Sequence, residues 1–262
     1  MRLEGKNAIV TGGAAGIGKA IAIALANEGA NVAIADVQME KAEAVAAQIR
    51  ADGLARKSVA IKCDVGDSAQ VDRMVAQVVA DLGGVHILVN NAAIISDGSF
   101  WNVSDETWNR LIRNNLSSVF YCSRAVARVL IAQKQGGRII NMSSIHATLS
   151  EPSAGPYTAA KGGIEAFSRT MATELAPYKV NVNCVAPGAT FSELTTPMYT
   201  EAVKQALFQR VPMKEIAQPE WIAAGVVFLA SDESRYMTGQ VITIDGGYVM
   251  DGSLPGAKYW TE

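Results

Sequence analysis

Residues 7–18 of the chain read NAIVTGGAAGIG, and this stretch predicts the first unit of the fold. The apolar run at 7–11 is typical of a buried strand, and apolar residues then recur at helical spacing from residue 17 to residue 25. The glycines between them let backbone N–H groups and the positive end of the helix approach a phosphate. Glycines also serve simple tight turning, but their place between a first strand and a first helix favours a pyrophosphate site. Its candidate residues are Gly12, Gly16, Ile17 and Gly18.

A carboxylate closes the second apolar run, residues 31–36 (NVAIAD). In a strand–helix–strand unit, an acid at this point can accept hydrogen bonds from the ribose hydroxyls of an adenosine. Asp36 therefore predicts a dinucleotide cofactor, while a solvent-facing aspartate at a strand end is the alternative. No Lys or Arg lies in the glycine turn or directly after Asp36, so no cation is placed to pair a 2′-phosphate. The sequence favours NAD over NADP.

Short apolar runs alternate with helical patterns along the rest of the chain. Further strands are expected at 59–62, 87–90, 138–142, 180–185 and 241–245, and helices at 38–52, 71–82, 104–135, 157–175, 201–209 and after Pro219. The alternation predicts an α/β fold: a single-domain, Rossmann-type, doubly wound parallel sheet of about seven strands with helices on both faces. The 262 residues contain no linker or repeat, so one NAD(P)-binding domain is expected over 1–262. A substrate loop at about 189–211 and a tail at 248–262 belong to it.

The composition excludes several classes of protein. Hydrophobic residues make up 49% and charged residues 18% of the chain, which is typical of a globular protein. Lys and Arg number 23 against 25 Asp and Glu, without a basic run, which argues against nucleic-acid binding. We find neither an apolar stretch of the roughly 18 residues that span a membrane nor a secretory signal, so we expect a cytoplasmic protein. The cysteines are too scattered for disulfides or a zinc site, and no metal is expected: Cys63, Cys122 and Cys184.

Tyr157 and Lys161 lie at i and i+4 near the start of a predicted helix and therefore share one face of it. A secondary alcohol that loses a hydride must also lose its hydroxyl proton, which requires a positioned base. A free tyrosine has a pKa of about 10, and a neighbouring ammonium with a positive nicotinamide ring can lower that pKa toward neutrality in a dry site. A surface Tyr/Lys pair is the alternative for these two residues alone. Ser144, just after the strand at 138–142, adds a hydroxyl that can hold the substrate oxygen.

Taken in order, these motifs resemble the short-chain dehydrogenase/reductase family from end to end. The resemblance implies an enzyme in which Tyr157 is the acid/base and Ser144 orients the reacting oxygen. Lys161 would bind the nicotinamide ribose and lower the pKa of the tyrosine, and Asn115 would hold a water molecule that relays protons. The motifs are residues 11–18 (TGGAAGIG), Asp64, Asn90-Asn91-Ala92, Asn115-Leu116, Ser144, Tyr157-x-x-x-Lys161 and Pro187-Gly188.

The same resemblance implies further contacts with the dinucleotide. The chain departs from the family pattern at Ala93, where the family often has glycine, and at Thr190, because the family's threonine often comes later. The implied contacts are Asp64 and Val65 with the adenine, Asn91 with the adjoining ribose, and Pro187, Gly188 and Thr190 along the nicotinamide, with Thr190 near its carboxamide.

A homo-oligomer, most simply a homotetramer with dihedral symmetry, is also implied by the resemblance. The predicted helices at 115–130 and 162–175 carry apolar residues on more than one face, which is consistent with burial against both the sheet and a partner. The tail, with Trp260, is apolar and aromatic enough to pack on a neighbouring subunit.

Two residues are candidates for substrate contacts beside Ser144 and Tyr157. His146 follows Ser144 by two positions, and Glu151 lies near the same cleft, where a carboxylate can bind sugar hydroxyls; roles in packing or at the surface stay open for both. Residues 143–146 (SSIH) with 187–189 (PGA) are similar to bacterial glucose 1-dehydrogenases. We therefore expect an NAD-dependent oxidoreductase that interconverts a secondary alcohol or sugar hemiacetal with its carbonyl or lactone by hydride transfer. A sugar, polyol or sugar acid is the expected small-molecule substrate.

Two other functions remain open. The first is a 3-oxoacyl-carrier-protein reductase, which normally uses NADPH and needs a basic patch for an acidic carrier; Asp36 and the net charge of −2 argue against it. The second, more remote, is a non-catalytic regulatory protein that senses a dinucleotide. Relatives adopt that role by losing the tyrosine or the lysine of the pair, and both are present here.

Overall fold

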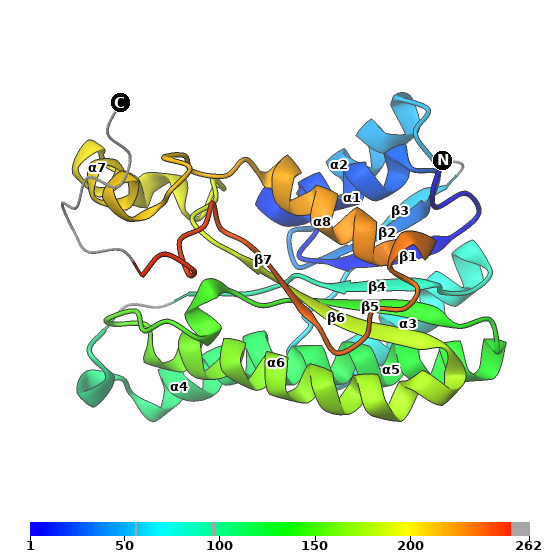
Figure 1. Cartoon of the computed structure of the whole chain (residues 1–262). Coiled ribbons are helices and arrows are strands. Elements are labelled where there is room, and N and C mark those ends of the chain that lie inside the picture. Colours follow the sequence, from blue (N-terminus) through cyan, green and yellow to red (C-terminus); the bar gives the residue numbers. More distant parts are fainter. Residues whose placement is uncertain (56, 96–97, 253–262) are drawn as a thin grey trace.

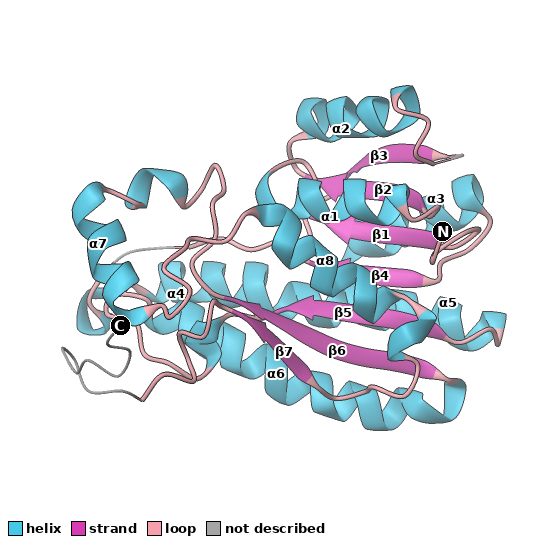
Figure 2. Cartoon of the chain, turned by 45° about the horizontal axis from the view of Figure 1, so that its top comes forward, coloured by secondary structure: helices cyan, strands magenta, loops and turns pink. Residues whose placement is uncertain are grey.

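The computed structural model describes residues 1–55, 57–95 and 98–252. Its strands form one parallel sheet in the order β3-β2-β1-β4-β5-β6-β7 (Figure 1), seen from another side in Figure 2. The chain winds outward in one direction from β1 to β3 and in the other from β4 to β7, so the predicted doubly wound, Rossmann-type sheet is confirmed. The strands are β1 (Asn7–Thr11), β2 (Asn31–Asp36), β3 (Ser58–Lys62), β4 (Ile87–Asn90), β5 (Gly137–Met142), β6 (Val180–Pro187) and β7 (Val241–Ile244).

Helices cover both faces of the sheet. In Figure 1, α1 and α8 lie over one face, and α3, α5 and α6 lie under the other. The α-helices are α1 (Gly16–Asn27), α2 (Met39–Ala51), α3 (Ser68–Leu82), α4 (Asp105–Ile112), α5 (Ser118–Gln133), α6 (Gly155–Leu175), α7 (Glu201–Arg210) and α8 (Pro219–Ala230). Short 3₁₀ turns are η1 (Phe100–Asn102), η3 (Ile145–Ala147), η4 (Ala176–Tyr178), η5 (Thr196–Met198) and η6 (Asp232–Ser234).

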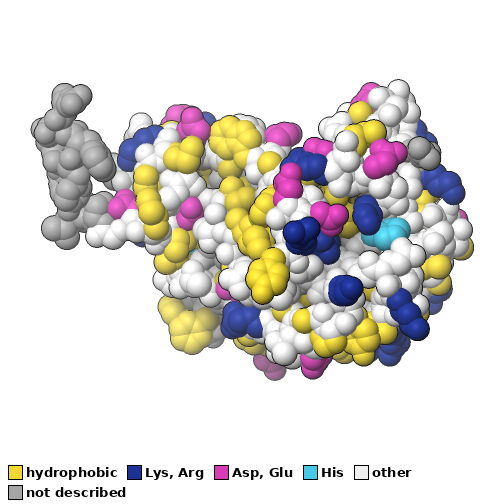
Figure 3. Space-filling view, turned by 45° about the vertical axis from the view of Figure 1, so that its right-hand side comes forward, with side chains coloured by type: hydrophobic (Ala, Val, Ile, Leu, Met, Phe, Trp, Pro, Cys, Tyr) yellow, Lys and Arg dark blue, Asp and Glu magenta, His cyan; other side chains and the backbone are white. Residues whose placement is uncertain are grey.

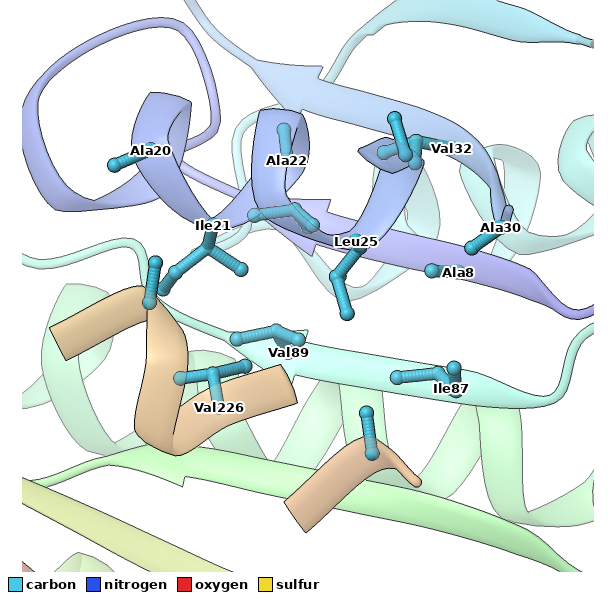
Figure 4. Close-up of a cluster of buried hydrophobic side chains, with 14 of the residues drawn as sticks. Ala8, Ala20, Ile21, Ala22, Leu25, Ala30, Val32, Ile87, Val89 and Val226 are labelled. Atoms are coloured by element: carbon cyan, nitrogen blue, oxygen red, sulfur yellow. The ribbon is translucent and has the colours of Figure 1, made fainter. Parts of the chain in front are cut away.

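Each face of the sheet is closed by its own apolar cluster. On one face, Ile21 and Leu25 of α1 and Val226 of α8 gather over Ile87 and Val89 of β4 (Figure 4). On the other face, buried side chains of α3, α5 and α6 pack against the sheet, and the free thiols of all three cysteines are buried. A strand covered on both faces needs apolar residues at successive positions, which is why β1, β2 and β4 are largely continuous apolar runs.

One predicted helix is wrong in detail. The expected helix at 104–135 begins as predicted, with the side chain of Ser104 accepting a hydrogen bond from the N–H of Thr107. It is then interrupted by a π-helical segment, η2 (Arg113–Ser117), before α5 continues. The wider π turn accommodates one extra residue and often marks a functional position, and Asn115 lies within it.

Other boundaries differ by a few residues. Helix α6 begins at Gly155 rather than 157, because Pro156 is well suited to a first helical turn. Strand β6 extends to Pro187, two residues beyond the prediction, and β7 ends at Ile244. The predicted tail at 248–262 is described only as far as residue 252, so Trp260 lies outside the described residues.

Two further findings concern the residues that the structure describes. None of their helices is long and apolar enough to cross a membrane. Among the same residues, no group of three or more His, Cys, Asp or Glu side chains could hold a metal ion.

Candidate active site

The predicted site residues gather at the carboxyl ends of the parallel strands. The glycine turn follows β1, Asp36 ends β2, Asn91 follows β4, Ser144 follows β5 and Gly188 follows β6. These ends lie on the side of the sheet that carries α7 (Figure 2). Open α/β sheets bind their ligands in the crevice outside these ends, so the fold brings the motifs to one place.

The glycine turn presents a helix start with unused N–H groups. Helix α1 begins at Gly16, and its N-cap residue, Ala15, makes no side-chain capping bond; the first turn carries no acidic residue. Both Gly12 (φ 62°) and Gly16 (φ 51°) have left-handed backbones that favour glycine. A Cβ on Gly18 would collide with the carbonyl oxygen of Gly12, so this glycine permits close packing of helix and turn. These features fit an anionic pyrophosphate.

Asn91 holds the glycine turn in place. Its side-chain amide donates hydrogen bonds of 3.0 Å to the carbonyl oxygens of Thr11 and Gly12. Its backbone N–H donates to Oγ1 of Thr11 at 3.0 Å. The predicted contact between Asn91 and a ribose therefore stays a prediction, and the contacts present are those of a clamp between β4 and the turn after β1.

Asp36 is a held carboxylate at the end of β2. It is 8% exposed, and its Oδ2 accepts the N–H of Ala14 at 3.1 Å while its Oδ1 accepts the N–H of Gln38 at 2.9 Å. Each oxygen retains a lone pair that a ribose hydroxyl can use. Asp64 is held similarly, with Oδ1 accepting the N–H of Gly66 at 2.8 Å beside the buried Val65.

The nearest basic side chain that follows Asp36 is engaged elsewhere. Lys41, in the first turn of α2, lies 2.9 Å from the carboxylate of Glu193 in the loop after β6. Lys41 lowers the pKa of Glu193, chiefly through that hydrogen bond. The ion pair links α2 to the loop after β6.

Tyr157, Lys161 and Ser144 form one connected group. The ammonium nitrogen of Lys161 lies 5.5 Å from the centre of the Tyr157 ring, and Lys161 is buried. Burial lowers the pKa of Lys161 to about 8. Burial also raises the pKa of Tyr157, while a side-chain hydrogen bond with Ser144 lowers it. The expected tyrosine with a depressed pKa is therefore not a property of the chain alone, because desolvation outweighs Ser144.

Asn115 and Ser144 are positioned by backbone contacts. Both ends of the Asn115 amide bond to Ile94, with 2.8 Å from Nδ2 to the carbonyl oxygen and 2.8 Å from Oδ1 to the amide nitrogen. The predicted water relay at Asn115 stays a prediction. Oγ of Ser144 accepts the N–H of His146 at 3.1 Å, which closes the short turn η3.

The structure brings the two proposed substrate residues together. Nε2 of His146 lies 3.5 Å from a carboxylate oxygen of Glu151. Nδ1 of His146 is buried and has no hydrogen-bond partner. Sequence position alone did not indicate this contact, which forms a polar pair on the loop between Ser144 and α6.

The loop after β6 passes close to the glycine turn. Oγ1 of Thr190 donates a 3.0 Å hydrogen bond to the carbonyl oxygen of Gly188, so its predicted place at a carboxamide stays a prediction. Ser192 lies directly against the turn, since a Cβ on Gly16 would come within 3.1 Å of its Cβ. Sequence reasoning missed Ser192 and Glu193, because neither belongs to a spaced motif.

Comparisons with known proteins agree with this geometry. The sequence profile of a family described as "Enoyl-(Acyl carrier protein) reductase" matches residues 12–249. The chain is 38% identical over 246 residues to the 3-oxoacyl-[acyl-carrier-protein] reductase FabG of Staphylococcus epidermidis, covering 94% of this chain and 99% of the relative. It is 39% identical over 250 residues to the FabG of Thermotoga maritima, covering 95% and 100%.

Solved structures show the same likeness. A short-chain type dehydrogenase/reductase from Mycobacterium marinum superposes with a TM-score of 0.88 at 36% identity, covering 94% of this chain and 96% of that one. A 7α-hydroxysteroid dehydrogenase, solved with NADH and 7-oxo glycochenodeoxycholic acid, has a TM-score of 0.91 at 32% identity, covering 95% and 96%.

Proposed function

The chain belongs to the short-chain dehydrogenase/reductase family, whose members are oxidoreductases acting on CH–OH groups, and from that premise we propose its cofactor, its substrate and the roles of its residues. We infer an NAD(H)-linked interconversion of a secondary alcohol and its ketone, with a 3-oxoacyl thioester as the favoured substrate. The observation that carries the reaction is the connected group of Ser144, Tyr157 and Lys161 beside an uncapped helix start.

The catalytic roles follow from the contacts. When bound, the nicotinamide ring supplies the hydride acceptor or donor. Ser144 holds the substrate oxygen by a hydrogen bond, and Tyr157 transfers the proton to or from that oxygen. The Lys161 ammonium, close to the Tyr157 ring, stabilises the phenolate that forms when the proton leaves. The intact pair supports turnover rather than a purely sensing role.

NAD(H) is proposed because of Asp36. Its two oxygens can accept ribose hydroxyls, while a 2′-phosphate would stand beside a held negative charge. Lys41, the cation that could offset this charge, pairs with Glu193. The likeness to the FabG relatives does not decide between NAD(H) and NADP(H).

A 3-oxoacyl substrate is favoured by the relatives and by apolar side chains near the catalytic helix. Phe100 and Trp101 of η1 are 75% and 72% exposed, and their rings meet edge to face with centres 5.2 Å apart. A Cβ on Gly155, at the start of α6 near Tyr157, would lie 3.6 Å from the Cβ of Phe100. An acyl chain can bury such rings, whereas most contacts of a sugar are polar.

A second candidate function, oxidation of a sugar, polyol or sugar acid, is supported by the pair His146–Glu151. The side chain of Glu151 is 51% exposed, and its carboxylate can accept hydrogen bonds from hydroxyl groups of a small polar substrate. Basic and acidic side chains are interspersed on the face that Figure 3 shows. The net charge of −2 also gives the chain no excess of positive charge that would attract an acidic carrier protein, whereas a small substrate needs none.

The test is a substrate panel with both cofactors. Acetoacetyl-coenzyme A and a longer 3-oxoacyl thioester are assayed for reduction by NADH and NADPH, and an aldose, a polyol and a sugar acid for oxidation by NAD and NADP. The proposal expects thioester reduction with NADH, abolished in Tyr157→Phe. Sugar oxidation without thioester reduction would establish the second candidate, and activity only with the phosphorylated cofactor would refute the role of Asp36.

A further inference from the structure

Three successive residues at the exit of β5 each interact with a different turn of α6. The backbone carbonyl of the first accepts a 2.7 Å hydrogen bond from a lysine, and the hydroxyl of the second donates a 2.6 Å hydrogen bond to a glutamate. The side chain of the third lies near enough to a tyrosine to lower the pKa of that tyrosine. The pairs, in chain order, are Met142 with Lys161, Ser143 with Glu165, and Ser144 with Tyr157.

The three partners on α6 lie on one face of the helix. Positions 157, 161 and 165 are spaced by four residues, so their side chains stand one above another along the face toward β5. Two of the pairs contain the proposed catalytic groups. The third pair, Ser143–Glu165, touches neither substrate nor cofactor in the proposed reaction and is unexplained by it.

We propose that Glu165 is a positioning residue: its hydrogen bond to Ser143 fixes the exit of β5 against α6 and so holds Ser144 at Tyr157. The inference concerns the same site as the proposed function and rests on it. It assigns Glu165 no contact with the reacting atoms. Ser143 is the element through which it acts.

The side chain of Ser143 is held by its hydrogen bond to Glu165. Ser143 is 3% exposed, and its backbone N–H donates a 2.7 Å hydrogen bond to the carbonyl oxygen of Val185 in β6. One side of the residue is thus held by the sheet and the other by Glu165. Hydrogen bonds to carboxylates are shorter and stronger than those between neutral groups. Removing the carboxylate would leave a buried hydroxyl without its acceptor, and the backbone would move to satisfy it.

A small movement at Ser143 is enough to matter, because Ser144 is the next residue in the chain. A displacement of about 1 Å in a catalytic group can lower a rate about a hundredfold. The cofactor crevice should be much less affected, because Asp36, Asn91 and the glycine turn make their contacts at β1, β2 and β4. Loss of the Ser143–Glu165 bond should therefore lower kcat and leave cofactor binding nearly unchanged.

Glutamine separates the hydrogen bond from the charge. Glu165→Gln keeps an oxygen that can accept from Ser143 but removes the negative charge that faces the buried thiol of Cys184. Glu165→Ala and Ser143→Ala each remove the bond. Ser234→Ala is the matched control, since Ser234 is equally buried and donates a 3.0 Å bond to the carbonyl of Leu229 at the end of α8.

The first measurement is steady-state kinetics of these variants and of the double variant that carries both Ser143→Ala and Glu165→Ala. We expect kcat to fall about tenfold or more in Glu165→Ala and in Ser143→Ala, with the KM for NADH within about twofold, since a positioning error acts on the chemical step. Glu165→Gln should keep kcat within about threefold, the double variant should be no worse than either single variant, and Ser234→Ala should match wild type. Equal kcat in wild type and Glu165→Ala, or additive losses in the double variant, would overturn the proposal.

The second measurement does not depend on turnover. The pKa of Tyr157 is determined by ultraviolet difference titration against the Tyr157→Phe variant, in wild type and in Glu165→Ala. Because the bond with Ser144 lowers the pKa of Tyr157, displacing Ser144 should raise that pKa in Glu165→Ala but not in Glu165→Gln. If wild type turns over no alcohol or ketone, the proposed function fails while this titration still decides the role of Glu165; a lower unfolding temperature with an unchanged tyrosine titration would show a purely structural role.

Discussion

Nζ of Lys161 lies 2.7 Å from the carbonyl oxygen of Met142 and donates a hydrogen bond to it, and Lys161 is only 3% exposed. This hydrogen bond uses one of the three N–H donors of the ammonium, the charge is desolvated by burial, and the pKa of Lys161 falls from 10.5 to about 8. The protein without cofactor therefore keeps a desolvated positive charge near the ring of Tyr157.

The desolvation of Lys161 should appear in the pH dependence of the free energy of unfolding. Between a pH of about 8 and 10.5 the unfolded chain keeps the lysine proton while the folded chain has lost it, so the unfolded state binds more protons and stability rises with pH. A shift of this size corresponds to roughly 3 kcal/mol over the full window. Urea unfolding of cofactor-free wild type and Lys161→Met at several pH values in this window measures it. The difference between the two free energies of unfolding should change in favour of wild type as pH rises; a constant difference would show that Lys161 is not desolvated.

A comparison of Gly12 and Gly53 distinguishes the cost of a left-handed backbone from the cost of crowding around an added Cβ. Both have left-handed φ angles, 62° and 65°, but a Cβ on Gly12 would lie 2.8 Å from Cα of Ala92, while none of the described atoms lies within 4 Å of a Cβ on Gly53. Gly12→Ala should therefore be more destabilising than Gly53→Ala by about 1–3 kcal/mol, the usual range for overpacking. Chemical denaturation of both variants measures the free energies of unfolding. Equal losses of stability would contradict the prediction and mean that the turn after β1 shifts to admit the Cβ at little cost.

Cofactor preference should depend on Asp36. Two unit charges 4 Å apart repel by about 4 kcal/mol at an effective dielectric of 20, and half of this already gives roughly a thirtyfold preference for NAD. Asp36→Ala should weaken NAD and relieve the repulsion of NADP, so that the ratio of kcat/KM values narrows without reversing. Full reversal would need a cation, for example in Val37→Arg. A wild type that prefers NADP, or a ratio unmoved by Asp36→Ala, would contradict the placement of the ribose at Asp36.

Association into a homotetramer remains a prediction, and one surface of the structure allows it to be tested. An apolar groove of about 410 Å³ lies between α5 and α6, and Phe120, which is 41% exposed, packs edge to face on Phe167 there. Phe120→Asp would bury a charge in any interface on this groove and should reduce the mass in solution. Sedimentation velocity at micromolar concentration measures it, with Val203→Asp on α7 as the control. A monomeric wild type would refute the prediction.

The fold could be predicted from the sequence because its signals are local. The inner strands β1, β2 and β4 are mostly apolar runs buried along nearly their whole length, and helices such as α1 and α3 repeat their buried apolar residues with the helical period. The π-helical turn around Asn115 could not be predicted, because one extra residue in a helix leaves the apolar spacing almost unchanged.

The site was predictable only where a short motif carries it. Tyr157 and Lys161 share a helix, so spacing alone placed them together. The contacts of Ser143 with Glu165, of His146 with Glu151 and of Lys41 with Glu193 join separate elements or loops, and no periodicity reports them. The pKa of Tyr157 also depends on burial in three dimensions, and its direction came out opposite to the one expected with cofactor bound.

The central claim is that Tyr157 transfers the proton and that NAD(H) binding does not need its hydroxyl. Tyr157→Phe tests this claim most directly. The substitution keeps the ring against Lys161 and removes the hydroxyl. General acid–base groups contribute roughly 10²–10⁴-fold, so kcat should fall at least about a hundredfold while the dissociation constant for NADH, from fluorescence titration, stays close to wild type. Activity above about a tenth of wild type with normal NADH binding would show that another residue moves the proton, and the account would be wrong.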